Sequence, residues 1–290
     1  MKIRRIVLTP LITVQVNIEW SQAADLRVAV VGLGPIGTEV IKALDRGMDG
    51  LVLVAVSVQN PGKHQALLAG LTKTPAVLPI EALCEIADIV IECAPARLLR
   101  SIVAPFVSSG KTAVVLSAGA LLENEDLIEL AKRNGGQIVV PTGALIGLDA
   151  VTAAAVGNIH SVRMVTRKPI LGLAGAPYIV ENKIDIERLT EPLKIFDGTA
   201  REAAKGFPAN LNVAVALSLA GVGPDRTRLE IWADPALTRN VHHIDVESDS
   251  ACFSMSIENV PSENPKTGLI TALSVIAYLR KQRSALRVGT

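Results

Sequence analysis

The sequence predicts an α/β protein in which a doubly wound parallel sheet is joined to a second, α+β domain with a mixed sheet. Apolar runs alternate with helical stretches between Arg27 and Pro141, as in parallel sheets whose strands are connected by crossover helices. After Pro141, strand-like runs follow one another without a helix between each pair, which indicates an antiparallel or mixed sheet. A chain of 290 residues can bury a core in each of two domains.

The first predicted strand, Val28–Val31, ends in a glycine-rich loop that a helical stretch, Thr38–Leu44, follows. The loop has the G-x-G-x-x-G spacing of Rossmann-type dinucleotide sites. In such sites the first glycine allows a tight turn, the second leaves room for the pyrophosphate, and the third lets the helix pack on the strand. Unpaired N–H groups at the helix N-terminus also favour phosphate. A turn with incidental glycines is the alternative, but the strand–turn–helix context favours cofactor binding by Gly32, Gly34, Pro35, Ile36 and Gly37.

The other elements of the first domain come from the same pattern. The expected strands are Leu51–Val56, Ile89–Ile91, Ala113–Leu116 and Ile138–Val140, and the helices are Glu81–Ala87, Leu98–Val107 and Asn124–Asn134. Ligands of such sheets bind beyond the carboxyl ends of the strands. We therefore expect Cys93, Ala94 and Ser117 to contact the cofactor, although each could equally belong to a plain β–α loop.

In the second half, we expect strands and helices in a different order. The expected strands are Ser161–Arg167, Tyr178–Asn182, Arg228–Ala233 and His242–Glu247, and the helices are Leu148–Val156, Ala200–Lys205, Leu211–Leu219 and Gly268–Gln282. The last helix is placed to return to the first domain. The expected boundaries are an N-terminal extension at 1–26, a dinucleotide-binding domain at 27–141, a substrate and dimerisation domain at 142–267, and a C-terminal helix at 268–290.

The composition argues against several classes of binding partner. The net charge is +1 and aromatic residues make up 3%, so neither nucleic acid nor an anionic membrane is indicated as a partner. Three widely spaced cysteines without a C-x-x-C pattern favour a reducing compartment, and we expect a cytoplasmic protein with no metal site. No segment reaches the ~20 apolar residues of a membrane span.

The N-terminus has the outline of a secretory signal. A basic start, Met1–Arg5, precedes a mostly apolar run, Ile6–Val16, and Ser21–Ala23 could pass for a cleavage site. Thr9 and Pro10 interrupt the apolar run, so we favour a surface extension over export.

Several segments of the second half, taken in order with the glycine loop, resemble the L-aspartate dehydrogenase family. They are Thr142–Ala150, Thr166–Pro169, Phe207–Ala214, Asn240–His242 and Asn264–Thr267. The resemblance covers nearly all of Arg27 to Arg280. It implies a homodimer that oxidises L-aspartate to iminoaspartate with NAD or NADP. Iminoaspartate then hydrolyses to oxaloacetate and ammonia or feeds NAD biosynthesis.

The resemblance also implies roles for single residues. His242 corresponds to the active-site histidine, and Ala144, Ile146 and Asn212 correspond to cofactor contacts. A histidine with its ordinary pKa of about 6.5 can transfer protons at neutral pH. His243 is adjacent and would point to the opposite face of a strand. A structural role is the alternative for any single histidine, and the family pattern favours catalysis by His242.

Aspartate has two carboxylates, so its pocket needs cationic or amide donors. Lys168 and Lys266 are the expected donors, with Thr267 at the start of the last helix. The alternative for each lysine is a solvated surface charge.

The sequence departs from the usual NAD site at the end of the second strand. Ser57–His64 contains no acidic residue to hold the ribose hydroxyls, whereas Lys63 could meet a 2′-phosphate. The sequence does not decide between NAD and NADP as the cofactor, and we predict that the protein accepts NADP at least as an alternative cofactor.

Three alternative functions remain from the sequence. One is another amino-acid dehydrogenase, and another is a non-catalytic sensor that binds NAD(P)H and a partner protein. The third is an enzyme like dihydrodipicolinate reductase, which is disfavoured because His242 and His243 are followed by Ile244–Glu247 without that family's lysine.

Overall fold

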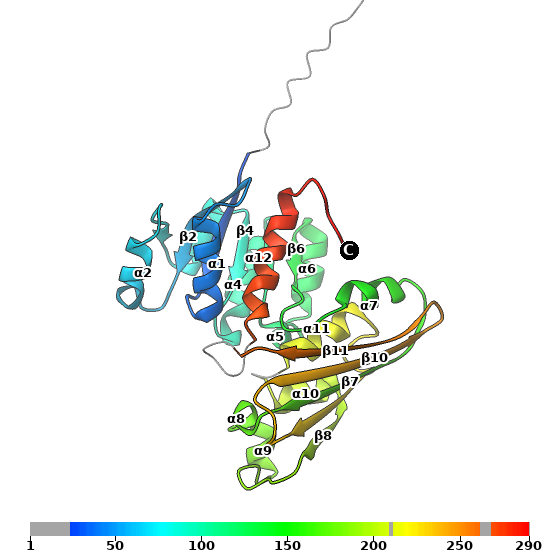
Figure 1. Cartoon of the computed structure of the whole chain (residues 1–290). Coiled ribbons are helices and arrows are strands. Elements are labelled where there is room, and N and C mark those ends of the chain that lie inside the picture. Colours follow the sequence, from blue (N-terminus) through cyan, green and yellow to red (C-terminus); the bar gives the residue numbers. More distant parts are fainter. Residues whose placement is uncertain (1–23, 209–210, 262–267, 290) are drawn as a thin grey trace, which may run out of the picture.

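The computed structural model describes residues 24–208, 211–261 and 268–289. In these parts of the chain, the strands form two sheets, one of six strands and one of five. Figure 1 shows the six-stranded sheet among its helices, with the five-stranded sheet below it.

The six-stranded sheet is parallel, with the strand order β3-β2-β1-β4-β5-β6. Its strands are β1 (Leu26–Val31), β2 (Leu51–Ser57), β3 (Ala76–Val77), β4 (Ile89–Glu92), β5 (Thr112–Val115) and β6 (Gln137–Val139). Central strands of such a sheet are covered on both faces, which explains their continuous apolar runs. Val28 and Val30 lie in the core on one face, and Ala29 and Val31 in the core on the other.

Helices cover both faces of this sheet. They are α1 (Pro35–Asp45), α2 (Gln65–Ala69), α3 (Ile80–Ile86), α4 (Leu99–Ser108), α5 (Ala118–Leu121) and α6 (Asp126–Asn134), with short 3₁₀ turns η1 (Pro61–His64) and η2 (Ala96–Leu98). The C-terminal helix α12 (Ile270–Arg283) lies beside α1 in Figure 1. Val275 and Leu279 of α12 are fully buried in the same core as Val40 of α1. The end of the chain therefore packs on the first sheet.

The five-stranded sheet has the order β11-β10-β7-β9-β8 and is mixed, since β7 and β9 are parallel and the other pairs antiparallel. Its strands are β7 (Ile159–Lys168), β8 (Leu193–Thr199), β9 (Thr227–Ala233), β10 (Asn240–Ser248) and β11 (Cys252–Asn259). The helices of this half are α7 (Leu148–Ala154), α8 (Ile170–Leu173), α9 (Pro177–Glu181), α10 (Ala200–Gly206) and α11 (Asn212–Ala220). Both sheets confirm the predicted fold class.

One predicted strand is wrong. The segment Tyr178–Asn182 lies almost entirely in helix α9, which Pro177 begins. Proline suits the first turn of a helix, and a short apolar run does not distinguish strand from helix. The Tyr178 ring packs against Phe196 and Phe207, with centroid distances of 5.4 and 5.2 Å. Strands β8 and β11 were not predicted.

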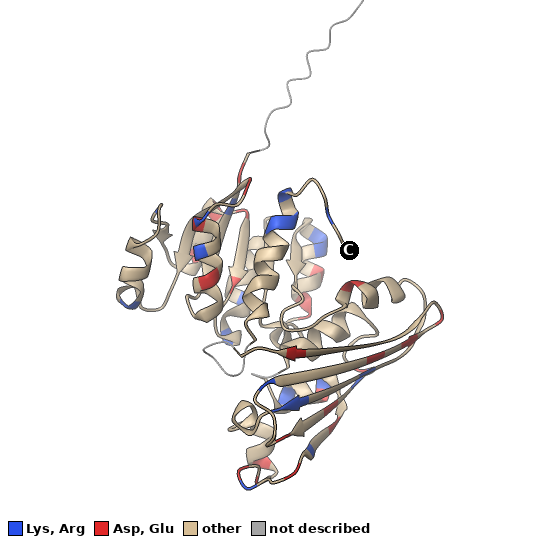
Figure 2. Cartoon of the chain, viewed as in Figure 1, with Lys and Arg blue, Asp and Glu red and all other residues tan. Residues whose placement is uncertain are grey.

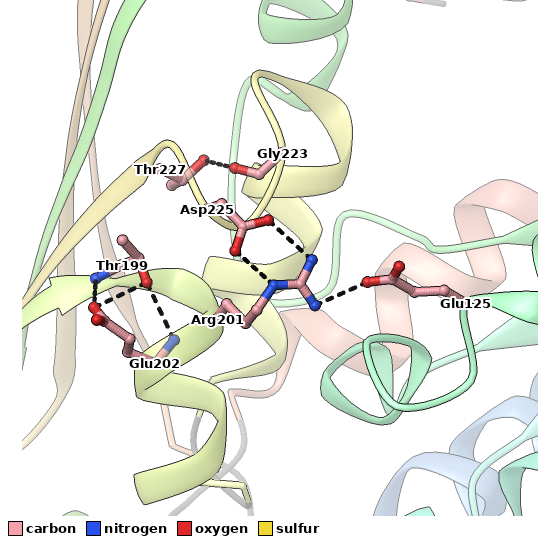
Figure 3. A network of polar contacts seen from close by, with 7 residues as sticks. All are labelled: Glu125, Thr199, Arg201, Glu202, Gly223, Asp225 and Thr227. Carbon is pink, nitrogen blue, oxygen red and sulfur yellow. Dashed lines mark hydrogen bonds and ion pairs between the residues drawn. The ribbon is translucent and has the colours of Figure 1, made fainter.

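Polar contacts of Arg201 join the two halves of the molecule (Figure 3). Arg201 of α10 binds Asp225 in its own half, with Nε to Oδ1 at 2.6 Å, and Glu125 beside α6, with Nη1 to Oε1 at 2.9 Å. Thr199 and Glu202 form a capping box that begins α10 and so holds Arg201 in place. These contacts help to keep the two halves in one relative position.

Candidate active site

The candidate site is a crevice between the two sheets. The carboxyl ends of β4 and β5 line one wall, and the carboxyl end of β7 and the start of β10 line the other. Predicted site residues from both halves line it: Ile36, Cys93, Ala94, Ser117, Ala144, Lys168, Asn212 and His242. Gly32, Gly34, Pro35, Gly37 and Ile146 are not among the lining residues. Lys266 and Thr267 lie outside the residues that the structure describes. The structure thus brings together residues that are up to 206 positions apart in the chain, from Ile36 to His242.

In the glycine loop, Gly32 and Gly37 pack against backbone atoms of the protein, whereas Gly34 faces open space. Gly32 has φ +89°, and a Cβ there would lie 2.4 Å from the carbonyl oxygen of Cys93. A Cβ on Gly37 would lie 2.0 Å from the carbonyl oxygen of Gly32, whereas a Cβ on Gly34 would meet nothing within 4 Å. Gly34 precedes α1, and Pro35 occupies its first turn. Open space before a helix N-terminus suits a diphosphate, so this loop fits a dinucleotide.

Asn212 begins α11 and connects the two halves. Its Oδ1 accepts a hydrogen bond from the backbone N–H of Gly119 at 3.0 Å. The family resemblance implied a cofactor contact for this residue. In the structure, the amide fixes the start of α5 at the crevice wall.

His242 lies on β10 and is 2% exposed. Its Nδ1 is 2.8 Å from Oγ1 of Thr166, its partner in the register with β7. Burial, with a contribution from the Lys168 charge, lowers the pKa of His242 to about 3. The sequence-based expectation of an ordinary pKa is therefore wrong, because burial disfavours the charged imidazole. The imidazole is neutral at physiological pH, which is the form that accepts a proton.

His243 points away from the crevice. It is exposed on the other face of the sheet, where its Nδ1 is 2.7 Å from Oγ of Ser256 and its Nε2 is 3.1 Å from Oδ1 of Asp245. This follows from the alternation of side chains along a strand.

Two polar side chains share the His242 side of the crevice. Lys168, at the end of β7, is 3% exposed, so it is not a solvated surface charge. Asn240 lies two residues before His242 on the same face of β10. Among the described residues, its Oδ1 is one of two buried side-chain atoms without a hydrogen-bond partner. A buried acceptor without a partner at a crevice wall indicates a ligand that donates hydrogen bonds. Asn240 belongs to the motif Asn240–His242, but no sequence pattern indicated a role for it.

Glu92, the last residue of β4, is a further site residue that was not predicted from the sequence. It is completely buried and lines the crevice. Burial raises the pKa of Glu92 to about 7, despite several hydrogen bonds that lower it. The available signal was a carboxylate directly after the apolar run Ile89–Ile91, because glutamate is rarely buried without partners.

Comparison with known proteins decides the family. Over 276 residues, the chain is 69% identical to an L-aspartate dehydrogenase of Bradyrhizobium diazoefficiens, with 95% of this chain and 98% of that protein covered. This chain belongs to the L-aspartate dehydrogenase family. It is also 56% identical to "L-aspartate dehydrogenase 3" of Bordetella bronchiseptica, over 93% of this chain and 100% of that protein.

Two family models match successive parts of the chain, and one solved structure has the same fold. Residues 149–282 match the model "Aspartate dehydrogenase, C-terminal", and residues 32–141 match "Homoserine dehydrogenase, NAD binding domain". The crystal structure of aspartate dehydrogenase from Thermotoga maritima has the same fold, with a TM-score of 0.72 and 22% identity over 91% of this chain and 99% of that one. The chain is therefore an NAD(P)-dependent oxidoreductase of this family, as the sequence resemblance implied.

The described residues contain no group of three or more His, Cys, Asp or Glu side chains that could hold a metal ion. No helix in this part of the chain is long and apolar enough to cross a membrane.

Proposed function

We propose that the protein oxidises L-aspartate to iminoaspartate in this crevice, and that iminoaspartate then hydrolyses to oxaloacetate and ammonia or feeds NAD biosynthesis. The observation that carries the proposal is the buried pair of a neutral imidazole, His242, and a lysine, Lys168, on the wall opposite the dinucleotide-binding half. When bound at the glycine loop, the nicotinamide cofactor supplies the hydride acceptor. The chain's own residues bind the amino acid and move its proton.

His242 is the proposed base. In this assignment, Nδ1–H donates to Oγ1 of Thr166, which leaves the Nε2 lone pair on the crevice side. The carboxylates of bound aspartate raise the pKa of the imidazole by favouring its charged form, and Nε2 then takes a proton from the substrate ammonium. The Cα–N bond then becomes C=N as the Cα hydrogen leaves with its electron pair. The same imidazole can activate the water that attacks the imine. Lys168 binds a substrate carboxylate, and the family resemblance adds Lys266 and Thr267 as further substrate contacts.

The test follows NAD(P)H absorbance with purified protein and a panel of L-amino acids, and with oxaloacetate plus ammonium in the reverse direction. We expect the highest kcat/KM with L-aspartate. A higher value with another amino acid would indicate a different amino-acid dehydrogenase. NADH binding without turnover of any substrate would instead favour the sensor.

NADP is proposed as an accepted cofactor beside NAD. Strand β2 ends at Ser57, and the loop that follows presents exposed Asn60 and Lys63 without a carboxylate. The Asn60 side chain accepts a hydrogen bond from the N–H of Lys63 at 3.4 Å and so begins η1. Turnover with NAD but none with NADP would exclude this part of the proposal.

We further propose a homodimer that uses the face of the five-stranded sheet opposite His242. Charged residues of both signs are interspersed along the strands of this sheet (Figure 2). The pair Arg163–Glu230, at 2.5 Å, lies on this face. This face also carries the half-buried Val165 and Trp232, and Arg167 lies over the Trp232 ring at 4.8 Å. A surface of mixed charges with an apolar centre can be self-complementary across a two-fold axis. Light scattering should give twice the chain mass for the wild type and a lower mass for Val165→Glu. Wild-type protein at the single-chain mass would contradict the dimer.

The cytoplasm is the proposed location. All three cysteines are unpaired in the structure, and the nicotinamide cofactor is available there. Localisation of a tagged chain in its own host tests this directly, and recovery outside the cytoplasm would contradict it.

A further inference from the structure

Glu92 connects the two loops that form the dinucleotide side of the crevice. One oxygen, Oε1, accepts from the backbone N–H of Ala94 at 3.1 Å and from Oγ of Ser117 at 3.0 Å. The other, Oε2, accepts from the N–H groups of Leu116 at 3.1 Å and Ser117 at 2.8 Å. Ala94 follows β4, whereas Leu116 and Ser117 follow β5, so one carboxylate fixes both loops.

This arrangement suits an ionised carboxylate, which only accepts hydrogen bonds. All four contacts come from N–H or O–H groups. A protonated acid or an amide would turn one of its atoms into a donor and leave a loop N–H without an acceptor. Leaving a buried donor unpaired costs about 1–3 kcal/mol. The conformation of the two loops, after β4 and after β5, therefore depends on the charge of Glu92.

The side chains next to Glu92 in the sheet are apolar, and few ionisable groups lie near it. In the sheet it lies between Val31 of β1 and Val115 of β5, which are both apolar. The ionisable groups around it are Cys93, which directly follows β4, and Lys168 and His242 on the opposite wall of the same crevice. Burial raises the pKa of the Cys93 thiol and holds His242 neutral. Burial raises the pKa of Glu92 to about 7, so Glu92 changes charge close to pH 7.

We propose that Glu92 is a positioning residue that holds the loop after β5, through the backbone of Leu116 and Ser117, in the conformation that binds the nicotinamide end of the cofactor. The inference rests on the proposed function because it takes Ser117 as a cofactor contact. It adds that cofactor affinity depends on the protonation of a residue beneath that contact. Ser117 touches the ligand, and Glu92 acts through it.

The first test compares wild type, Glu92→Gln and the control Glu85→Gln. Glu85 lies exposed on α3, so its substitution makes the same chemical change without the buried contacts. NADH fluorescence titration at about pH 8 should show a roughly tenfold or larger rise in Kd for Glu92→Gln, which corresponds to about 1.4 kcal/mol. The Glu85→Gln Kd should equal that of the wild type. Equal Kd values for all three proteins would overturn the proposal.

The second test uses wild-type protein alone, so it does not depend on whether Glu92→Gln folds. The NADH Kd should rise as the pH falls from about 8.5 to about 6, because protonation removes an acceptor from the loop. A flat profile would overturn the proposal. In Glu92→Gln, the profile should be flat at the weaker affinity, and a retained slope would show that another group titrates.

The third test separates loop positioning from general stability without any cofactor. Amide hydrogen exchange in the cofactor-free protein should be faster at Leu116 and Ser117 in Glu92→Gln than in the control, with the core of β1 unchanged. Unchanged exchange at these two amides would overturn the positioning role. If the wild type binds no NADH at any pH, the proposed function fails, whereas NADH binding that ignores Glu92 defeats only this inference.

Discussion

The hydroxyl oxygen of Thr166 lies 2.8 Å from Nδ1 of His242, and both side chains are buried between neighbouring strands. A hydrogen bond at Nδ1 fixes the ring orientation and determines which nitrogen faces the crevice. This pair sets up the proposed base without a carboxylate partner, and a neutral hydroxyl leaves the imidazole uncharged.

Thr166→Val removes this contact while keeping the side-chain shape. We expect kcat to fall about tenfold, since a net hydrogen bond contributes about 1 kcal/mol and orientation adds to it. The NADH Kd should stay unchanged. Thr166→Ser, which keeps the hydroxyl, should recover most of the rate. An unaltered kcat in Thr166→Val would show that the contact has no part in catalysis.

His242→Asn should lower kcat by about 10²–10⁴-fold, the range of general acid–base catalysis. Steady-state assays with L-aspartate measure this loss. Cofactor affinity should be retained, because the glycine loop lies on the other half of the molecule. A variant that retains normal turnover would remove His242 from the mechanism.

Lys168→Met should raise the KM for L-aspartate about tenfold or more, since a charge-assisted contact contributes about 1.5–3 kcal/mol. The loss of this cation also raises the pKa of His242 toward its ordinary value. The acid limb of the pH–rate profile should therefore move to higher pH. If the KM keeps its wild-type value, Lys168 does not bind substrate.

Substitution by alanine should affect stability differently at Gly34 and at Gly37. Gly34 has φ −71° and open space around its Cβ position, so Gly34→Ala should keep the wild-type Tm. Gly34→Val should also fold but weaken NADH binding by filling the space of the diphosphate. Gly37→Ala places a Cβ against the carbonyl of Gly32 and should destabilise the fold by about 1–3 kcal/mol. Calorimetry and NADH titration distinguish the two effects, and equal Tm values for both alanine variants would contradict the packing argument.

His242 also makes the protein sensitive to acid. Its pKa is about 3 when folded and about 6.5 when unfolded, so the unfolded chain binds the extra proton between these values and stability falls as the pH drops below about 6.5. Glu92 acts in the opposite direction, because burial raises its pKa to about 7 in the folded protein. Between about pH 7 and pH 4.5 the folded state binds this proton more tightly than the unfolded chain, so Glu92 increases stability as the pH falls. Denaturant unfolding gives the free energy of unfolding of wild type and His242→Asn at each pH. The difference between the two proteins isolates the contribution of the histidine to the pH dependence. We expect the variant to lose less stability between about pH 6.5 and pH 5, and parallel curves would contradict this.

Local sequence patterns determined much of this protein. The order strand, glycine loop and helix requires a tight turn whatever lies elsewhere, and the crowding of Gly32 and Gly37 shows the physical reason. The alternation of residues along a strand separated His242 from His243. Apolar runs between helices predicted the parallel sheet, because buried central strands need apolar residues on both faces.

Tertiary structure decided the rest, because burial and partners depend on residues far apart in the chain. The segment beginning at Tyr178 is a helix within an aromatic cluster, which a short apolar run could not indicate. The low pKa of His242 and the unpartnered oxygen of Asn240 arise only once two strands and two domains enclose them. Glu92 carries no motif of its own. Its role depends on backbone N–H groups that the fold brings to the carboxylate from 24 and 25 positions further along the chain.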